Sequence, residues 1–345
     1  MGQIFPAHKR HYVRGFLHGT VGVVIVIVLL GILLWSVGAI YFSNLPSEDF
    51  RAVAAIFFGA AWIVAFAVFR NRLRTTLVFL ATFAVLLVWW STISPSHDRN
   101  WRPEVARLPR AEIHGDLVTI RNVRDFDYRS ENDFTVRYKD KTYDLNDIRT
   151  VDLVLSHWDD IIVVGHMILS FGFGNGDYIS VSVETRLEKG EPQSAIRGLF
   201  KQYELIYVLA EERDVIRLRT SFRNEDVYLY PTRATSDEVR ALFLDIVKRV
   251  NQIAERPEFY NTFVQNCSTA LVPHIEKVRG PRDFDPRMLL NGFSDKMAYD
   301  RGVLDTDLSF AGTKARHYIN QYVRHDDRAD GYSRRIRPHL TPQSP

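Results

Sequence analysis

The chain has 345 residues and a formal net charge of only +3, which gives no electrostatic basis for nucleic-acid binding. Its apolar residues are unevenly distributed: the stretch up to about residue 95 is mostly apolar, and the rest is rich in charged residues. We therefore predict a membrane anchor over residues 1–94, a linker over 95–115, a soluble domain over 116–310 and a polar tail over 311–345.

Three uncharged apolar runs predict three transmembrane helices. The runs cover Val21–Phe42, Ala52–Phe69 and Leu77–Trp90, and a helix needs about 20 apolar residues to cross the bilayer core. Basic residues precede the first run and separate the second from the third, whereas the loop between the first two has Arg51 as its one basic residue. Because cytoplasmic loops carry the excess of Lys and Arg, we expect a cytoplasmic N-terminus and an outer soluble domain.

This topology predicts a multi-pass protein of the inner (cytoplasmic) membrane with its soluble domain in the periplasm. The sequence has one cysteine, Cys267, so it cannot form an internal disulfide in that oxidising compartment. An unpaired periplasmic thiol is a candidate reactive group. The sequence contains no Cys–His spacing that suits zinc and no glycine-rich phosphate loop, so we expect neither a metal nor an organic cofactor.

Most predicted strands of the soluble domain come before most of its predicted helices, and the fold that we expect is α+β. Strands are predicted at Leu117–Val123, Phe134–Tyr138, Thr142–Leu145, Val151–Leu155, Ile161–Phe173, Tyr178–Glu184, Tyr203–Ala210 and Val227–Tyr230. Hairpin turns are predicted at Lys139–Lys141 and Gly174–Asp177. Helices are predicted at Pro192–Lys201, at Asp237–Ala254 with Ser236 as its cap, and from Cys267 onward with Asn266 as its cap.

The sequence around Cys267 places the thiol in the first turn of a helix, directly after the N-cap residue Asn266. The positive end of the helix dipole lowers the pKa of a thiol at that position and favours the reactive thiolate. The structural alternative is that Cys267 is a small buried hydrophobic residue, as free cysteines often are.

A histidine and a glutamate upstream complete a candidate catalytic set. His166 lies in the apolar strand Gly165–Phe173. A thiol nucleophile needs a base, and the base needs an orienting group. The turn that follows pairs this strand with Tyr178–Glu184 and brings Glu184 roughly opposite His166. The sequence therefore predicts Cys267 as nucleophile, His166 as base and Glu184 as orienting group.

Structural roles for the histidine and the glutamate remain open at this stage. A histidine inside an apolar strand, such as His166, is often a core residue with satisfied hydrogen bonds. Glu184 has Arg186 and Arg197 as alternative partners for a purely structural ion pair.

Two other histidines compete for the role of base. His157 precedes a probable turn, and His274 lies seven residues after Cys267. Seven residues along a helix separate two side chains by about 10 Å, which is too far for a direct hydrogen bond. Pro273 is also expected to end or kink the helix just before His274.

Two motifs resemble those of a known family. They are G-H-x-x-L-S-F-G-F at Gly165–Phe173 and Y-N-x-x-x-x-N-C-S at Tyr260–Ser268. With their surroundings, about residues 145–300, they resemble the Lnb N-terminal periplasmic domain family. That family resembles circularly permuted papain-like folds of the NlpC kind, in which the base histidine precedes the nucleophilic cysteine, as His166 precedes Cys267. The activity that the resemblance implies is lipoprotein N-acylation, the transfer of an acyl chain to the α-amine of a lipidated cysteine.

The expected protein is thus three N-terminal transmembrane helices followed by a papain-like α+β domain in the periplasm. We expect a cysteine acyltransferase or hydrolase that acts through a Cys267 thioester on a membrane lipid or lipoprotein. The same chemistry suits a cell-wall amidase or peptidase. A non-catalytic envelope binding protein, with an inert Cys267, is the alternative from a different class.

The predicted topology is testable with a reporter. Alkaline phosphatase fused to the C-terminus should be active, because that enzyme needs the oxidising periplasm to form its disulfides. The same reporter fused in the basic loop Arg70–Arg74 should be inactive. An inactive C-terminal fusion, together with an active cytoplasmic reporter at the same point, would contradict the periplasmic location.

Overall fold

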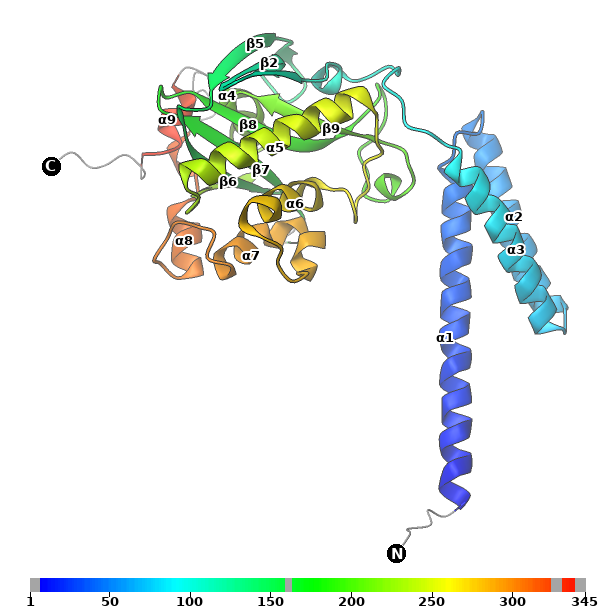
Figure 1. The fold of residues 1–345 in the computed structure, drawn as a ribbon. Coiled ribbons are helices and arrows are strands. Elements are labelled where there is room, and N and C mark those ends of the chain that lie inside the picture. The colour runs from blue at the N-terminus through cyan, green and yellow to red at the C-terminus, as the bar shows by residue number, and fades with distance from the viewer. Residues whose placement is uncertain (1–6, 159–162, 324–330, 339–345) are drawn as a thin grey trace, which may run out of the picture. The chain divides into compact units, whose positions relative to one another are not determined.

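The computed structural model describes residues 7–158, 163–323 and 331–338 (Figure 1). The chain divides into two compact units. One unit contains Met1–Ser94 with Phe200–Gln202, and the other contains Pro95–Leu199 with Tyr203–Pro345. Each unit is described by itself below.

The first unit contains three long apolar helices. They are α1 (Ala7–Tyr41), α2 (Glu48–Val68) and α3 (Arg72–Ser91). Each is long and apolar enough to cross a membrane, α1 from Thr20 onward, which confirms the three predicted spans. Most of their apolar side chains point outward, as lipid contact requires, and Ile40, Ala55 and Leu86 form a small core between the helices.

The second unit is an α+β domain built on an eight-stranded sheet. In chain order the strands are β1 (Arg110–His114), β2 (Leu117–Arg124), β5 (Tyr138–Asp144), β6 (Ile148–His157), β7 (Gly165–Phe173), β8 (Tyr178–Arg186), β9 (Glu204–Ala210) and β10 (Asp226–Pro231). The order across the sheet is β1-β2-β9-β8-β7-β6-β10, and β5 also pairs with β2. Paired strands are antiparallel except β2 and β9. The short strands β3 (Asp127–Tyr128) and β4 (Phe134–Thr135) form a separate pair.

Most α-helices of this unit follow the last strand, and α4 lies between β9 and β10. The α-helices are α4 (Glu212–Arg217), α5 (Ser236–Glu255), α6 (Cys267–Arg279), α7 (Ser294–Asp300), α8 (Phe310–Arg316) and α9 (Tyr332–Arg335). A π-helical turn, η3 (Leu218–Phe222), continues α4. The 3₁₀ turns are η1 (Pro103–Val105), η2 (Arg197–Leu199), η4 (Pro286–Leu289), η5 (Asn291–Phe293) and η6 (Asn320–Tyr322).

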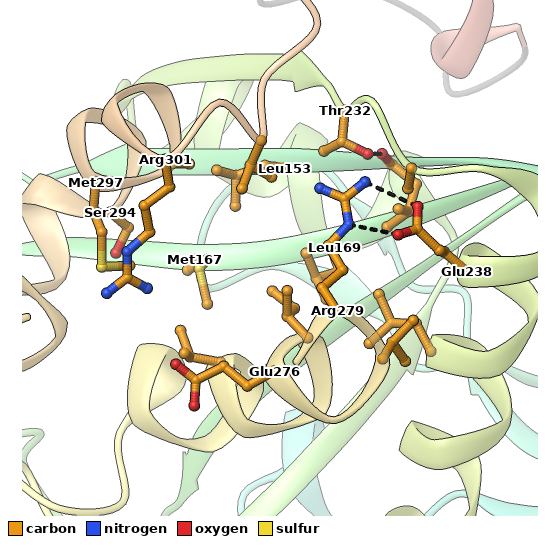
Figure 2. Close-up of a pocket in the computed structure, with 18 of the residues that line it drawn as sticks. Leu153, Met167, Leu169, Thr232, Glu238, Glu276, Arg279, Ser294, Met297 and Arg301 are labelled. Atoms are coloured by element: carbon orange, nitrogen blue, oxygen red, sulfur yellow. Dashed lines mark hydrogen bonds and ion pairs between the residues drawn. The ribbon is translucent and has the colours of Figure 1, made fainter. Parts of the chain in front are cut away.

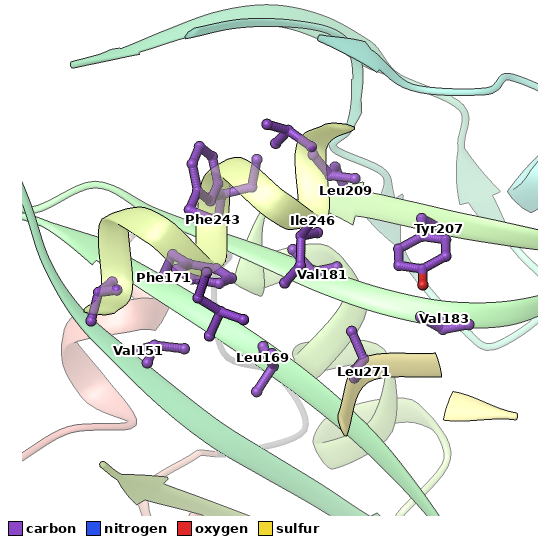
Figure 3. Packing of buried hydrophobic residues seen from close by; sticks show 14 of the residues in the cluster. Val151, Leu169, Phe171, Val181, Val183, Tyr207, Leu209, Phe243, Ile246 and Leu271 are labelled. Atoms are coloured by element: carbon purple, nitrogen blue, oxygen red, sulfur yellow. The ribbon is translucent and has the colours of Figure 1, made fainter. Parts of the chain in front are cut away.

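Helices α5 and α6 cover one face of the sheet, and the main apolar core lies between them and the strands (Figure 3). The buried apolar residues of α5 recur at helical spacing and form one stripe along the helix. Phe243 of this stripe contacts Phe171 of β7 edge-on, with ring centroids 5.1 Å apart. Leu271 of α6 joins the same core, so packing on the sheet fixes the position of α6.

The opposite face carries a second apolar cluster, which includes Ile168 of β7, Ile206 of β9 and Val215 of α4. Successive side chains of a strand point to opposite faces of a sheet. Met167 accordingly belongs to the first core and its neighbour Ile168 to the second.

The predicted hairpin is confirmed, because β7 and β8 pair antiparallel with Gly172 opposite Tyr178. The strand expected at Ile161–Phe173 begins at Gly165, and residues 161–162 lie outside the described part of the chain. The strands expected at Tyr203–Ala210 and Val227–Tyr230 are present as β9 and β10.

Two local predictions are wrong for a reason that lies in tertiary contacts. The expected turn Lys139–Lys141 is part of β5, which pairs with β2 while its charged side chains stay partly exposed. An edge strand tolerates such charges, so polarity there does not mark a turn. The helix expected at Pro192–Lys201 is reduced to the single turn η2. The segment before it makes hydrogen bonds from Ser194 N–H to the Tyr203 hydroxyl instead.

The predicted cap of α5 is also wrong by one residue. Thr235, and not Ser236, accepts the hydrogen bond from the Glu238 N–H, and the Glu238 side chain accepts from the Thr235 N–H. A capping box needs Glu or Gln three residues after the cap, and only Thr235 has Glu238 at that spacing.

Part of the segment expected to be a polar tail is buried in the second unit. Arg337 donates to Asp152 of β6 at 2.8 and 2.9 Å and to Glu212 of α4 at 2.8 Å. Tyr332 and Ile336 are buried beside it in the second apolar cluster. Strand β1 similarly begins inside the segment expected to be a linker. The folded unit thus takes contributions from both flanking segments.

Removing Arg337 should destabilise the domain. The Arg337→Gln change leaves Asp152 and Glu212 as buried carboxylates without their cation, which typically costs about 3–5 kcal/mol of unfolding free energy. Urea denaturation of the detergent-solubilised protein measures this loss. Arg334→Gln, at an exposed position of α9, three residues before Arg337, is the matched control and should unfold like the wild type. An Arg337→Gln protein with wild-type stability would contradict the buried ion network.

Candidate active site around Cys267

Helix α6 begins at the cysteine, as the sequence predicts. The Asn266 side chain caps the helix, because Oδ1 accepts hydrogen bonds from the N–H groups of Ser268 at 3.0 Å and Thr269 at 2.9 Å. The Thr269 hydroxyl accepts from the Asn266 N–H at 2.8 Å, which completes a capping box. This cap fixes the thiol in the first turn, where the helix dipole favours negative charge.

Burial dominates the electrostatics of the thiol. Cys267 is only 3% exposed, and burial raises the pKa of its thiol above the ordinary value, against hydrogen bonds that involve Met167 and Ser268. The prediction that the helix start lowers this pKa is therefore wrong. Burial removes the hydration of a thiolate, and this cost exceeds the stabilisation that the first turn of the helix provides. The resting group is therefore a neutral thiol.

Sequence reasoning missed one residue that contacts the sulfur. Asn291, at the start of η5, donates from Nδ2 to Cys267 Sγ at 3.0 Å. A hydrogen bond of 2.9 Å between the hydroxyls of Ser268 and Ser294 ties the end of that turn to α6. The sequence signal at this position is an Asn-Gly pair, which marks a turn and says nothing of the sulfur 24 residues earlier.

His166 is connected to Glu184 through Ser182, a neighbour on β8. The imidazole Nε2 lies 2.6 Å from Ser182 Oγ, and this hydroxyl donates to Glu184 Oε1 at 2.8 Å. A hydroxyl has a single proton to donate. Because that proton forms the hydrogen bond to the carboxylate, Ser182 accepts a hydrogen bond from the Nε2–H of His166. The network therefore assigns the lone pair, and with it the basic character, to Nδ1 of the imidazole.

The charges around this relay keep the imidazole neutral. Burial, followed by the positive charge of Arg219, lowers the pKa of His166 to about 3. Although burial opposes it, the positive charge of Arg124 helps to hold the pKa of Glu184 at about 2. Arg219 also lies 3.8 Å from Glu184 Oε1. The cation beside Glu184 is therefore Arg219 and not Arg186, which the structural alternative named and which donates to backbone carbonyls.

His166, Glu184, Cys267 and Asn291 line one cavity of about 360 Å³. The described residues form no hydrogen bond between Cys267 Sγ and the His166 imidazole. Successive side chains of β7 point to opposite faces of the sheet. Met167 points to the face that α6 covers and packs in the same core as Cys267. His166 points to the opposite face, where it hydrogen-bonds to Ser182. Both side chains nevertheless line the same cavity, together with Gly165 at the start of β7.

The two competing histidines lie outside the residues that line this cavity. His157 Nε2 is 3.4 Å from the Lys314 ammonium. His274 is held by Asp245, at 2.7 Å from Nδ1, and by the Tyr207 hydroxyl, at 3.3 Å from Nε2. Helix α6 continues through Pro273 to Arg279, so the predicted helix end before His274 is wrong. Both histidines have structural partners.

A second, smaller cavity lies between α6, α7 and the sheet (Figure 2). Its volume is about 80 Å³, and apolar residues such as Leu153, Met167 and Met297 form most of its wall. An ion pair of 2.9 Å between Arg279 and Glu238 lies at its edge. Within the described residues, no group of three or more His, Cys, Asp or Glu side chains could hold a metal ion.

The buried, neutral imidazole predicts how stability depends on pH. His166 titrates near pH 6.5 when unfolded and near pH 3 in the folded protein. Its contribution to stability is therefore complete above the unfolded value and is lost as the pH falls toward 3. Between about pH 7 and pH 5, the wild type should lose about 2 kcal/mol more unfolding free energy than His166→Gln.

Urea denaturation at the two pH values measures this difference. His114→Gln removes an exposed histidine and should lose as much stability as the wild type. If His166→Gln also behaves like the wild type, the imidazole is not held neutral by burial, and the electrostatic description of the site is wrong.

Comparison with known proteins identifies part of the chain. Searches of curated proteins and of solved structures found no match. Residues 134–292 match the family model of the Lnb N-terminal periplasmic domain. The matched segment contains His166, Glu184, Cys267 and Asn291. The chain is therefore a membrane-anchored protein that carries an Lnb N-terminal periplasmic domain.

Proposed function

We propose that this protein is a periplasmic cysteine acyltransferase or hydrolase, anchored in the inner membrane, that forms a thioester on Cys267 with a lipid or lipoprotein substrate. One observation carries the proposal: a single cavity is lined by the thiol, an amide that donates to it, and a histidine connected to a carboxylate. The match to a periplasmic domain family and the three apolar helices support its location.

In the proposed first step, the thiol proton passes to Nδ1 of His166 as the sulfur attacks a substrate carbonyl. The relay through Ser182 to Glu184 then stabilises the imidazolium, because the carboxylate carries a full negative charge at neutral pH. No direct hydrogen bond joins sulfur and imidazole in the structure. Catalytic hydrogen bonds are often long or poorly aligned without substrate and tighten when it binds.

The proposed oxyanion site uses donors that already surround the sulfur. Asn291 Nδ2 lies 3.0 Å from Cys267 Sγ, so it can turn its N–H groups to the carbonyl oxygen that forms beside the sulfur. The Cys267 N–H belongs to the first turn of α6, whose donors favour negative charge. Collapse of the tetrahedral intermediate breaks the bond to the leaving group, and the imidazolium protonates that group.

In the second half-reaction an amine or water attacks the thioester. His166 takes the proton of the attacking group, the carbon–sulfur bond breaks, and the proton returns to the thiolate. An amine acceptor gives acyl transfer and water gives hydrolysis. Anchoring in the membrane raises the local concentration of lipid-linked substrates around the site.

The order of the residues supports a permuted papain-like fold of the NlpC kind. His166 stands on strand β7, before the helix that begins with Cys267, and that helix packs on an antiparallel part of the sheet. In this proposal Glu184 orients the imidazole through Ser182 and not by direct contact.

Trapping the acyl-enzyme tests the proposal. The detergent-solubilised protein, incubated with membrane phospholipids and lipoproteins, should gain the mass of an acyl chain on Cys267, which hydroxylamine removes. Cys267→Ser should lose function because a hydroxyl is far less acidic than a thiol. His166→Ala should lower the rate on the order of a hundredfold or more through loss of the base.

The controls separate catalysis from folding. His157→Ala, a histidine of the neighbouring strand outside the cavity, should retain the rate of acylation. The Cys267→Ser protein should melt like the wild type, because the change removes little volume. A fully active and stable Cys267→Ser protein would exclude the thioester. Acylation by peptide amides and not by lipids would instead indicate a cell-wall amidase.

A further inference from the structure

Exposed apolar side chains gather around the large cavity. Val163, Phe263 and Leu290 line it, although each of them is exposed to solvent. Two further exposed apolar residues, Ile196 and Val264, each directly follow a lining residue. Single exposed apolar residues are normal on a protein surface, whereas a group of them marks a surface that meets a partner or a membrane. We call these five side chains the apolar rim.

Two hydrogen-bonded loops carry the most exposed part of this rim. The Thr262 hydroxyl donates to the Ala195 carbonyl at 2.7 Å, which holds the loop of Ile196 beside the loop of Phe263 and Val264. Ile196 is 61% exposed, Phe263 is 52% exposed and Val264 is 74% exposed. These three side chains therefore belong to one surface, and most of their area has no partner within the protein.

The tip formed by Phe263 and Val264 is built for contact with lipid. Two backbone hydrogen bonds between Asn261 and Gln265, of 2.9 and 3.3 Å, close the tip. Within it, Asn261 Oδ1 accepts from the N–H groups of Phe263 at 3.0 Å and Val264 at 3.1 Å. A backbone N–H without an acceptor is costly where water is absent. Because both N–H groups are satisfied inside the tip, its two apolar side chains can leave water without stranding a donor.

The chain itself connects the rim to the membrane-spanning helices. Ile196 precedes Phe200 by four residues, and Phe200–Gln202 belongs to the first unit. In that unit the Phe200 ring stacks on Phe42, with ring centroids 5.2 Å apart, and contacts Trp90 edge-on. Phe42 directly follows α1, and Trp90 lies in the last turn of α3. Four residues span at most about 14 Å, so Ile196 is tethered within reach of the ends of these spans.

From these observations we infer that the apolar rim docks into the surface of the membrane that anchors the protein, so that a lipid substrate passes from the bilayer into the cavity. The route of the substrate rests on the proposed function, whereas docking itself needs no catalysis. Cys267 follows Val264 by three residues, which span at most about 11 Å. Docking of the tip therefore brings the start of α6, and the cavity that the thiol lines, to the lipid.

The energy of such docking suits a tethered surface. Full burial of a Val, Ile or Phe side chain stabilises by about 1.5–3 kcal/mol, and the rim residues gain a part of that because each is already partly covered. A gain of this size holds a freely diffusing protein on a membrane only weakly. The three spans of the same chain keep the rim at a high local concentration near lipid, so a weak contact is sufficient. This is why the rim is assigned to the bilayer and not to a second protein.

The first experiment measures contact with lipid directly, on the full chain in proteoliposomes. Cys267→Ser removes the one native cysteine, and Val264→Cys then gives a single site for a nitrobenzoxadiazole label. Phosphatidylcholine with a doxyl group high on its acyl chain should quench this label severalfold more than the same label at Val136→Cys, an exposed valine outside the cavity lining. Equal quenching at the two positions would overturn the inference. Emission that depends on protein density and not on doxyl lipid would also overturn it and would indicate a second copy.

The second experiment links docking to the reaction. Ile196→Ser combined with Val264→Ser should slow acylation of Cys267 by the phospholipid of the proteoliposomes severalfold more than acylation by a water-soluble short-chain ester. Both positions are exposed, so stability should change little. Val136→Ser should leave both rates unchanged. The same effect on both donors, or none on either, would contradict entry from the bilayer. Lipid quenching of the label at Val264→Cys without acylation by any donor would support docking and refute the thioester mechanism.

Discussion

The negative charge of the partly buried Glu184 is the constraint on which the candidate site depends. Arg124 and Arg219 hold this carboxylate ionised inside the domain. Because it is ionised, it accepts a hydrogen bond from the Ser182 hydroxyl, and Ser182 must then accept one from the Nε2–H of His166. The tautomer of the imidazole, and the nitrogen that can act as a base, follow from that single charge. Removing the charge would free Ser182 to donate to the imidazole and would exchange the two nitrogens.

Patterns within about 20 residues predicted the framework of this site. Alternating apolar residues and a Gly-Asn-Gly-Asp turn predicted the β7–β8 hairpin, and the capping residue Asn266 predicted where α6 begins. The hairpin register also brought Glu184 to the neighbourhood of His166. It could not show that Ser182 stands between them, because register fixes which backbone positions face each other and not how far each side chain reaches.

Contacts between distant segments were beyond prediction. Asn291 meets the sulfur only because the hydroxyls of Ser268 and Ser294 join two segments of weak local pattern. Arg337 reaches the core from a stretch whose polar composition resembles a solvated tail. The raised pKa of Cys267 has the same origin: helix position is visible in the sequence, whereas burial depends on everything packed around the residue.

Burial therefore gives the site a neutral resting state. It raises the pKa of the thiol and lowers that of the imidazole, so a thiolate–imidazolium pair is disfavoured. A protonated thiol is a poor nucleophile and resists oxidation, since the thiolate is the species that oxidants attack. For the one cysteine of a chain with a periplasmic domain, such a state protects the sulfur from oxidation. In the proposed mechanism, reactivity must then come with the substrate, because its binding in the cavity changes the surroundings of the thiol and the imidazole.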